Sequence, residues 1–143
     1  MSMRIRSIAT VVPPHRISQT AAGSVARRTC VAADDEQARI DQFYRHSGVH
    51  TRHSVLLDSE EGKHPGFYPP AQSRDDRGPT TALRQERFER EAPALATAAA
   101  RPALDMAGLV PADITHVVSI SCTGFQAPGF DVAAITALDL PAT

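Results

Sequence analysis

The chain has 143 residues, of which 42% are hydrophobic and 22% are charged, and its formal net charge is -1. These values are near the averages for globular proteins, so they exclude a fibrous or largely disordered chain and predict one domain with a sizeable core. The small net charge argues against nucleic acid or an anionic membrane as a partner and favours small-molecule chemistry.

Neither a membrane-spanning segment nor a signal peptide is predicted. No apolar run approaches the roughly 18 residues that a membrane helix needs, and the apolar run near the N-terminus is too short for a signal peptide. The two cysteines, Cys30 and Cys122, are too few for a disulfide framework. We therefore expect a cytoplasmic protein with no membrane insertion.

The first part of the chain is predicted to hold a strand, one or two helices and an extended arm. β-Branched residues in RIRSIATVVPP (4–14) predict a strand that ends at the proline pair. Ser18 suits a helix N-cap, and helical spacing continues from there to a stop at Gly48. The stretch VHTRHSVLL (49–57) is then predicted to be a short strand or an extended arm.

A long helix is predicted after a loop. Residues from about 57 to 79 are rich in proline, glycine and charge, which predicts a loop excursion within one domain. Strong helix formers then predict a helix from about Thr80 to Leu109, with kinks or breaks at Pro93 and Pro102. Its segment RQERFERE (84–91) is interpreted as an exposed face with pairs such as Glu86 and Arg90, and it is assigned no function.

The last part of the chain is predicted to be a buried strand, a loop and a helix. The continuous apolar run ITHVVSIS (114–121) is typical of a strand that is covered on both faces. A helix is expected to begin near Phe130 or Asp131. The alternation of strands and helices predicts an α/β fold rather than an all-β fold or a helix bundle.

The loop SCTGFQAPGFD (121–131) is the main candidate site. A cysteine at the carboxyl end of a buried strand is where an α/β enzyme could keep a nucleophile, but activation of a thiol needs a helix N-terminus or a cationic neighbour. Three interpretations of Cys122 therefore stay open: a nucleophile, a cavity-lining residue or an inert buried thiol.

His46, His50 and His53 fall within eight residues, but their segment is predicted to be extended, so no metal site is expected.

Four separated stretches carry a resemblance to a known family: HSGVHTRHSV, RQERFEREAPALA, GLVPADITHVVSISCTGFQAPGFD and LDLPAT. With them the chain resembles the N-terminal part of bacterial type III polyketide synthases, relatives of chalcone synthase. The resemblance runs over nearly the whole chain. Its most specific element is the loop, in which six residues stand in the family's places: Cys122, Thr123, Gly124, Pro128, Gly129 and Asp131.

The resemblance implies a thiolase-like α/β fold of αβαβα layers, of which residues 1–143 form an incomplete N-terminal portion with no second domain. It implies an acyltransferase that condenses an acyl-CoA starter with malonyl-CoA in a homodimer, with coenzyme A thioesters as substrates and no cofactor. In the family, the nucleophilic cysteine, the histidine and the asparagine stand at positions that would fall beyond Thr143. No catalytic residue is therefore expected in this chain, and the chain alone is expected to be inactive.

The resemblance also assigns roles to residues of this sequence. It places Cys122, Thr123, Gly124 and Phe125 in the wall of the substrate cavity, and Ala127, Pro128 and Gly129 in a loop at the dimer interface. Ala127 stands where plant relatives carry a bulky residue, which implies a larger cavity and a longer acyl starter. The segment with Arg45, His46 and Arg52 resembles the one that holds coenzyme A phosphates, and a solvated basic face is the alternative.

Two other functions stay open. The chain could be part of a ketoacyl synthase III-like condensing enzyme, which has a similar basic segment, or a non-catalytic remnant that acts as an interaction module.

The family usually has glycine where this chain has Asp139, at a place where the last helix should end in a left-handed turn. The end of that helix is therefore expected to be less well ordered than in the family.

Overall fold

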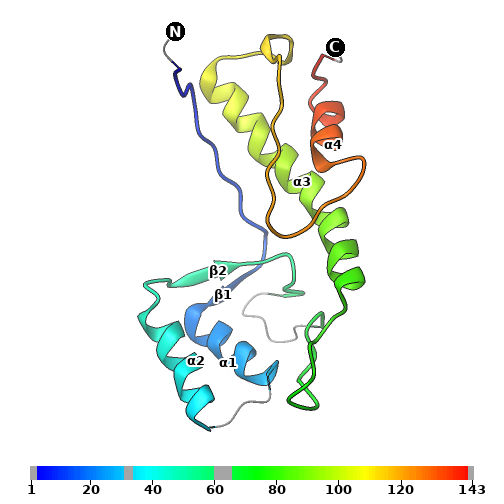
Figure 1. Cartoon of the computed structure of the whole chain (residues 1–143). Coiled ribbons are helices and arrows are strands. Elements are labelled where there is room, and N and C mark those ends of the chain that lie inside the picture. Colours follow the sequence, from blue (N-terminus) through cyan, green and yellow to red (C-terminus); the bar gives the residue numbers. More distant parts are fainter. Residues whose placement is uncertain (1–2, 31–33, 60–65, 142–143) are drawn as a thin grey trace. The chain divides into compact units, whose positions relative to one another are not determined.

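The computed structural model describes residues 3–30, 34–59 and 66–141, and the chain divides into two compact units (Figure 1). We call Val12–Thr80 the sheet unit, and Met1–Val11 together with Thr81–Thr143 the long-helix unit. Each unit is described by itself. Within the described residues, no helix has both the length and the apolar character that a bilayer span requires.

The sheet unit is built from two short strands and two helices. Its elements are β1 (Arg16–Ser18), α1 (Gln19–Arg28), α2 (Asp34–His46) and β2 (Thr51–His53). The strands pair antiparallel, with Ile17 opposite Arg52. The Ser18 side chain caps α1 by accepting a hydrogen bond from the Ala21 N–H at 3.2 Å. The two helices between Ser18 and Gly48 and the short strand in 49–57 are thus confirmed.

The core of the sheet unit is small but closed. Ile17, Ala22 and Leu57 are between 4% and 8% exposed. Three partly buried side chains pack around them, namely Ala21, Val25 and Tyr44. One strand, one helix and the segment after β2 therefore share one apolar centre.

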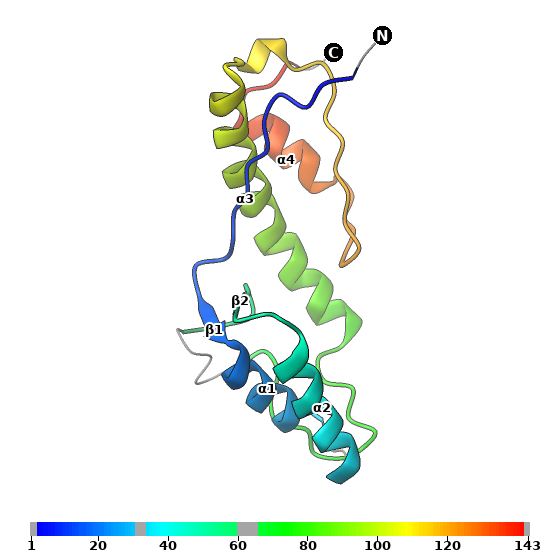
Figure 2. The same cartoon turned by 90° about the vertical axis from the view of Figure 1, so that its left-hand side faces the viewer.

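The long-helix unit is dominated by α3 (Thr81–Ala107), which is followed by a 3₁₀ turn and by α4 (Phe130–Ala137). The long helix is confirmed, and it runs without a break through Pro93 and Pro102. Figures 1 and 2 both show α4 lying alongside α3. The Arg101 side chain on α3 donates a hydrogen bond to the last carbonyl of α4, that of Ala137, at 3.2 Å.

Two strand predictions are wrong. Among the described residues, the structure has β1 and β2 as its strands, and residues 4–11 and 114–121 follow extended paths without ladder pairing. Val118 is 82% exposed and Ile120 is 89% exposed, where a strand covered on both faces was expected. A strand forms only where a second segment accepts and donates its main-chain hydrogen bonds, and no described segment does so here.

Candidate functional site

The loop 121–129 begins with a turn that is fixed by a serine. The Ser121 hydroxyl accepts hydrogen bonds from the N–H groups of Thr123 and Gly124, at 3.2 and 3.5 Å. Turns of this kind form because a serine oxygen can bond to the main chain two or three residues later. The turn redirects the chain from the extended segment towards the start of α4.

The N-terminal part of α3 holds the middle of this loop. The Gln85 side-chain oxygen accepts a hydrogen bond from the Phe125 N–H at 3.3 Å, and the Gln85 side-chain nitrogen donates to the Phe125 carbonyl. One turn along α3, the Phe88 ring meets the Phe130 ring edge to face, with centroids 6.0 Å apart. The loop is therefore attached to α3 both by polar and by aromatic contacts.

Cys122 has few contacts in the described part of the chain. Its thiol is exposed, and its recorded polar contact is a long one of 4.0 Å to the Thr123 hydroxyl. His116, the histidine nearest to Cys122 in the sequence, has its Nδ1 at 3.0 Å from the Thr115 hydroxyl. A nucleophilic thiolate needs a base or a cation beside it, and the contact with Thr123 supplies neither, so the role of Cys122 stays a prediction.

The remaining predicted loop residues lie on both sides of a cis peptide. The Ala127–Pro128 bond is cis, and both residues are exposed. Gly129 is the N-cap of α4, and its carbonyl accepts the hydrogen bond from the Val132 N–H at 3.1 Å. The side chains of Thr123 and Phe125 are exposed as well, the latter to 80%. Whether these residues line a cavity or an interface stays a prediction.

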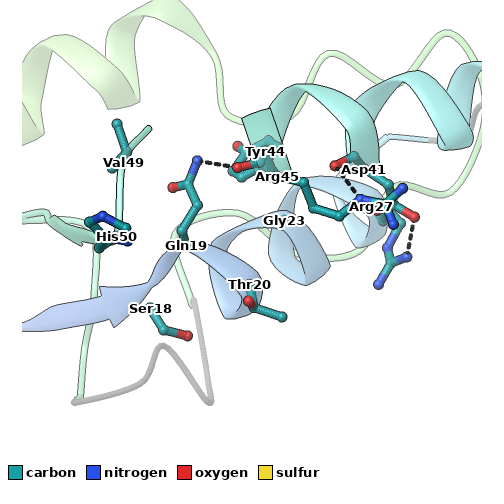
Figure 3. A pocket seen from close by; sticks show the side chains of 10 residues that line it. All are labelled: Ser18, Gln19, Thr20, Gly23, Arg27, Asp41, Tyr44, Arg45, Val49 and His50. Carbon is teal, nitrogen blue, oxygen red and sulfur yellow. Dashed lines mark hydrogen bonds and ion pairs between the residues drawn. The ribbon is translucent and has the colours of Figure 1, made fainter. Parts of the chain in front are cut away.

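The sheet unit contains a pocket of about 450 Å³ between α1, α2 and the segment before β2. Figure 3 shows Gln19 between Tyr44 and the Val49–His50 segment, with Arg27 and Asp41 at the other end. Ten residues line the pocket: Ser18, Gln19, Thr20, Gly23, Arg27, Asp41, Tyr44, Arg45, Val49 and His50.

Gln19 organises one wall of this pocket. Only 8% of the residue is exposed, and its side-chain nitrogen donates to the Tyr44 carbonyl at 3.0 Å and to the Ser47 hydroxyl at 2.6 Å. Its side-chain oxygen accepts a hydrogen bond from the Arg52 Nε at 2.7 Å. The Arg52 guanidinium also lies over the Tyr44 ring, 5.4 Å from its centroid. A buried amide with all its groups paired joins α1, the end of α2 and β2.

The charged side chains of the pocket come mainly from the two helices. Arg27 on α1 and Asp41 on α2 form an ion pair of 2.9 Å. Arg45 donates from its Nε to the Asp41 carbonyl at 3.3 Å, a contact that uses one of its five donors. With His50 at the opposite end, the pocket offers several donors and a net positive charge, which suits a phosphate group.

The structure brings only some of the predicted CoA-binding residues together. Arg45 lines this pocket, whereas His46 lines a separate hollow on α2 and has its Nδ1 at 3.0 Å from the Gln42 carbonyl. Arg52 is engaged with Gln19 and Tyr44 beside the pocket. Sequence reasoning missed Gln19 and Arg27. Gln19 follows a helix cap directly, and this position carries no sequence signal for a buried amide.

Comparison with known proteins adds an independent finding. Residues 2–143 match the family model described as chalcone and stilbene synthases, N-terminal domain. A 1,3,6,8-tetrahydroxynaphthalene synthase of Streptomyces coelicolor is 31% identical over 133 residues, which are 92% of this chain and 31% of that protein. A phloroglucinol synthase of Pseudomonas fluorescens is 38% identical over 93 residues, or 65% of this chain and 23% of that protein. The chain thus spans less than a third of the length of these relatives.

Solved structures agree with the sequence matches. A crystal structure of PKS-I from the brown alga Ectocarpus siliculosus has a TM-score of 0.75 and 28% identity, over 95% of this chain and 36% of that one. A crystal structure of CsyB complexed with CoA-SH has a TM-score of 0.71 and 26% identity, over 95% of this chain and 33% of that one. These likenesses confirm both the resemblance found in the sequence and the expected α/β fold class.

Proposed function

We propose that this chain, which belongs to the chalcone and stilbene synthase family, supplies the N-terminal domain of a type III polyketide synthase. Such an enzyme transfers an acyl starter from coenzyme A and extends it with malonyl-CoA. The observation that carries the proposal is the match of residues 2–143 to the N-terminal domain of that family. The tetrahydroxynaphthalene and phloroglucinol synthases among the relatives support it.

The proposed reaction has two bond-forming steps. First, a base takes the proton of a cysteine thiol, the resulting thiolate attacks the starter thioester, and the base returns the proton to the leaving group, so that CoA-SH departs. Second, malonyl-CoA loses CO₂ to give a thioester enolate, which attacks the acyl-enzyme and releases the cysteine thiolate again. Donors that stabilise the enolate lower the barrier because negative charge develops on its oxygen. The reaction uses coenzyme A thioesters as substrates and needs no cofactor.

In this proposal, Cys122 lines the cavity and another cysteine of the synthase is the nucleophile. The support is the environment of Cys122, whose thiol is exposed and whose recorded polar contact is the Thr123 hydroxyl at 4.0 Å. Thr123, Gly124 and Phe125 form the same wall. The small Ala127 beside Pro128 and Gly129 leaves space at a dimer interface, which favours a longer acyl starter.

The proposal assigns the coenzyme A phosphates to the basic part of the sheet unit. Arg45 lines the pocket together with Arg27 and His50, and Arg52 lies directly beside it. Arginine suits phosphate because its planar guanidinium can donate two parallel hydrogen bonds. The solved CsyB complex with CoA-SH shows that a structural relative of this chain binds this ligand.

An activity assay with acyl-enzyme mapping tests the proposal. The chain replaces the matching N-terminal part of the Streptomyces coelicolor tetrahydroxynaphthalene synthase. The chimera is first shown to fold by circular dichroism and is then incubated with acyl-CoA starters of several lengths and malonyl-CoA. We expect pyrone, resorcinol or naphthalene products by mass spectrometry. Absence of any condensation product with all starters would overturn the proposed function.

The role of Cys122 is tested in the same assembly. Cys122→Ser should change product length or rate and leave the covalent acyl group on the protein, because a wall residue shapes the cavity but forms no bond to substrate. Cys30→Ser, at the chain's other exposed cysteine, is the matched control and should leave both properties unchanged. Loss of the acyl group from the Cys122→Ser protein would instead make Cys122 the nucleophile.

A further inference from the structure

We propose that Gln85 of α3 is the positioning residue that fixes the main chain of the loop 121–129. The loop's role as a cavity wall rests on the proposed function, whereas the contacts that position it can be tested without any activity. Gln85 lies in a helical segment that looks like an ordinary solvated face in the sequence. Its side chain instead reaches Phe125, forty residues further along the chain.

Both polar groups of the Gln85 side chain are paired with the main chain of Phe125. Its oxygen accepts from the Phe125 N–H at 3.3 Å, and its nitrogen donates both to the Phe125 carbonyl and, within α3, to the Glu89 carboxylate at 3.1 Å. A carboxamide can satisfy the donor and the acceptor of one residue at the same time, as a neighbouring strand would do. Asparagine has the same groups on a side chain that is one methylene shorter, so it would not reach. The contact therefore substitutes for the ladder pairing that this part of the chain lacks.

Gly124 comes very close to two side chains of α3. A Cβ atom at position 124 would lie 2.6 Å from Phe88 Cγ and 2.8 Å from Phe88 Cδ1, and 3.1 Å from the Gln85 side-chain oxygen. Gln85 and Phe88 are three residues apart, so they share one face of the helix. Glycine at position 124 lets the main chain come near enough for Gln85 to bond with Phe125.

The loop is held to α3 through the main chain of Phe125, while three of its side chains point into solvent. Cys122 and Thr123 are exposed, and Phe125 is 80% exposed although its N–H and C=O are both bonded. Side chains at these positions can therefore vary without loss of the contact with Gln85. A cavity wall built in this way keeps its position when its side chains are substituted. Gln85 would therefore determine the position of the loop's main chain.

Amide hydrogen exchange of the whole chain tests this assignment. In Gln85→Ala, the Phe125 amide should exchange about tenfold faster, because it loses its acceptor and the loop opens more often. Glu86→Ala, at the exposed neighbouring position, is the matched control and should leave the loop unchanged. Amides of α1 and α2 lie in the other unit and serve as the internal reference for folding.

A charged variant separates positioning from general support of the helix. In Gln85→Glu the carboxylate can accept from the Phe125 N–H but repels the Phe125 carbonyl, so exchange should be fast at neutral pH. Below a pH of about 4 the carboxyl is protonated and can donate again, so protection relative to Gln85→Ala should return. Because Glu89 lies one turn along α3 from position 85, the same measurement is repeated with Glu89→Gln in the chain. A recovery that persists there comes from the bond to Phe125 and not from relief of charge repulsion within α3.

Gly124→Ala, alone and combined with Phe88→Ala, tests the close approach of the loop to α3. The added methyl should push the loop away from Phe88 and speed up Phe125 exchange, and Phe88→Ala in the same chain should restore part of the protection. The proposal is overturned if Gln85→Ala leaves Phe125 exchange unchanged. It is overturned equally if Phe125 in the unsubstituted chain exchanges as fast as in an unstructured peptide. Neither outcome depends on condensing activity, so the proposed function would stand or fall separately.

Discussion

Two isoleucines, one in each unit, show how differently the units treat their apolar residues. Ile17 in β1 of the sheet unit is 4% exposed, whereas Ile120 in the long-helix unit is 89% exposed. The sheet unit closes a small core around Ile17, and no described residue of α3 is buried even though α3 is the longest of the described helices. Exposed apolar surface of this kind is typical of an interface. The long-helix unit, which carries the candidate cavity loop, holds most of the exposed large apolar side chains, although Ala134 and Leu138 in it are buried.

The sharpest test of this comparison is the same substitution in both units. Ile17→Ala should lower the free energy of unfolding of the sheet unit by about 2–5 kcal/mol, because it removes buried methyl groups and leaves a cavity. Ile120→Ala should change stability by less than about 0.5 kcal/mol, because its side chain is already in water. Both tyrosines, Tyr44 and Tyr68, lie in the sheet unit and the chain has no tryptophan, so tyrosine fluorescence in urea reports on that unit alone.

The opposite outcome would be an equal loss of unfolding free energy at both positions. If Ile120→Ala destabilised the chain as much as Ile17→Ala does, Ile120 would be covered in solution. A melting temperature that rises with protein concentration would then identify a second copy as the cover, because association stabilises the folded state by mass action. Circular dichroism measures the unfolding of the long-helix unit in this experiment, since α3 with its 27 residues dominates the helical signal.

Helices were predicted from the sequence far better than strands. The caps and stops of the helices are local, and Ser18, Gly48 and Gly108 stand where the structure begins or ends an element. A strand depends on a partner that is distant in sequence, so the apolar run 114–121 could not show by itself that nothing described pairs with it. The segment 4–14 failed for the same reason, and the true strand β1 begins after the proline pair.

The site was predictable only where a motif carries it. The loop 121–131 could be found because several of its residues occur together in a known family. Gln85 could not be found, because a bond from a side chain to a distant main chain leaves no trace in spacing or composition. The structure also pairs Arg87 with Glu91 at 3.2 Å, and Arg90 with the same carboxylate, in place of the expected Glu86 and Arg90 pair.

A smaller effect is expected at the cap of the sheet unit's first helix. Ser18→Ala should lower the free energy of unfolding by about 1 kcal/mol, because the Ala21 N–H loses its acceptor at the start of α1. Ser24→Ala in the middle of the same helix is the control and should be neutral or slightly stabilising, since alanine is the better helix former. Urea unfolding followed by tyrosine fluorescence measures both. A loss at Ser24 that matched the loss at Ser18 would show that the cap contributes nothing special.

The smallest effect is expected at the end of α4 in the long-helix unit, where Asp139 has a φ of 54°. The left-handed turn predicted there is thus present, and it is closed by hydrogen bonds from the Asp139 N–H to the Thr136 carbonyl at 3.3 Å and from the Leu140 N–H to the Ile135 carbonyl at 3.0 Å. An L-residue in this conformation costs about 1–2 kcal/mol, and glycine avoids that cost. Glycine also loses more freedom on folding, by about 0.4–1 kcal/mol.

Asp139→Gly should therefore stabilise the end of α4 by about 0.5 kcal/mol, the net of these two opposing terms. The amide exchange of Leu140 measures it, because its N–H closes the turn and should exchange more slowly in the variant. Ala98→Gly at an exposed position in the middle of α3 is the control, and it should destabilise its helix, since glycine is a poor residue in a helix interior. If both substitutions had the same sign, the strain at Asp139 would not limit the end of α4. Opposite signs would show that even in the unit with the less complete core, local backbone geometry still sets the stability of a helix end.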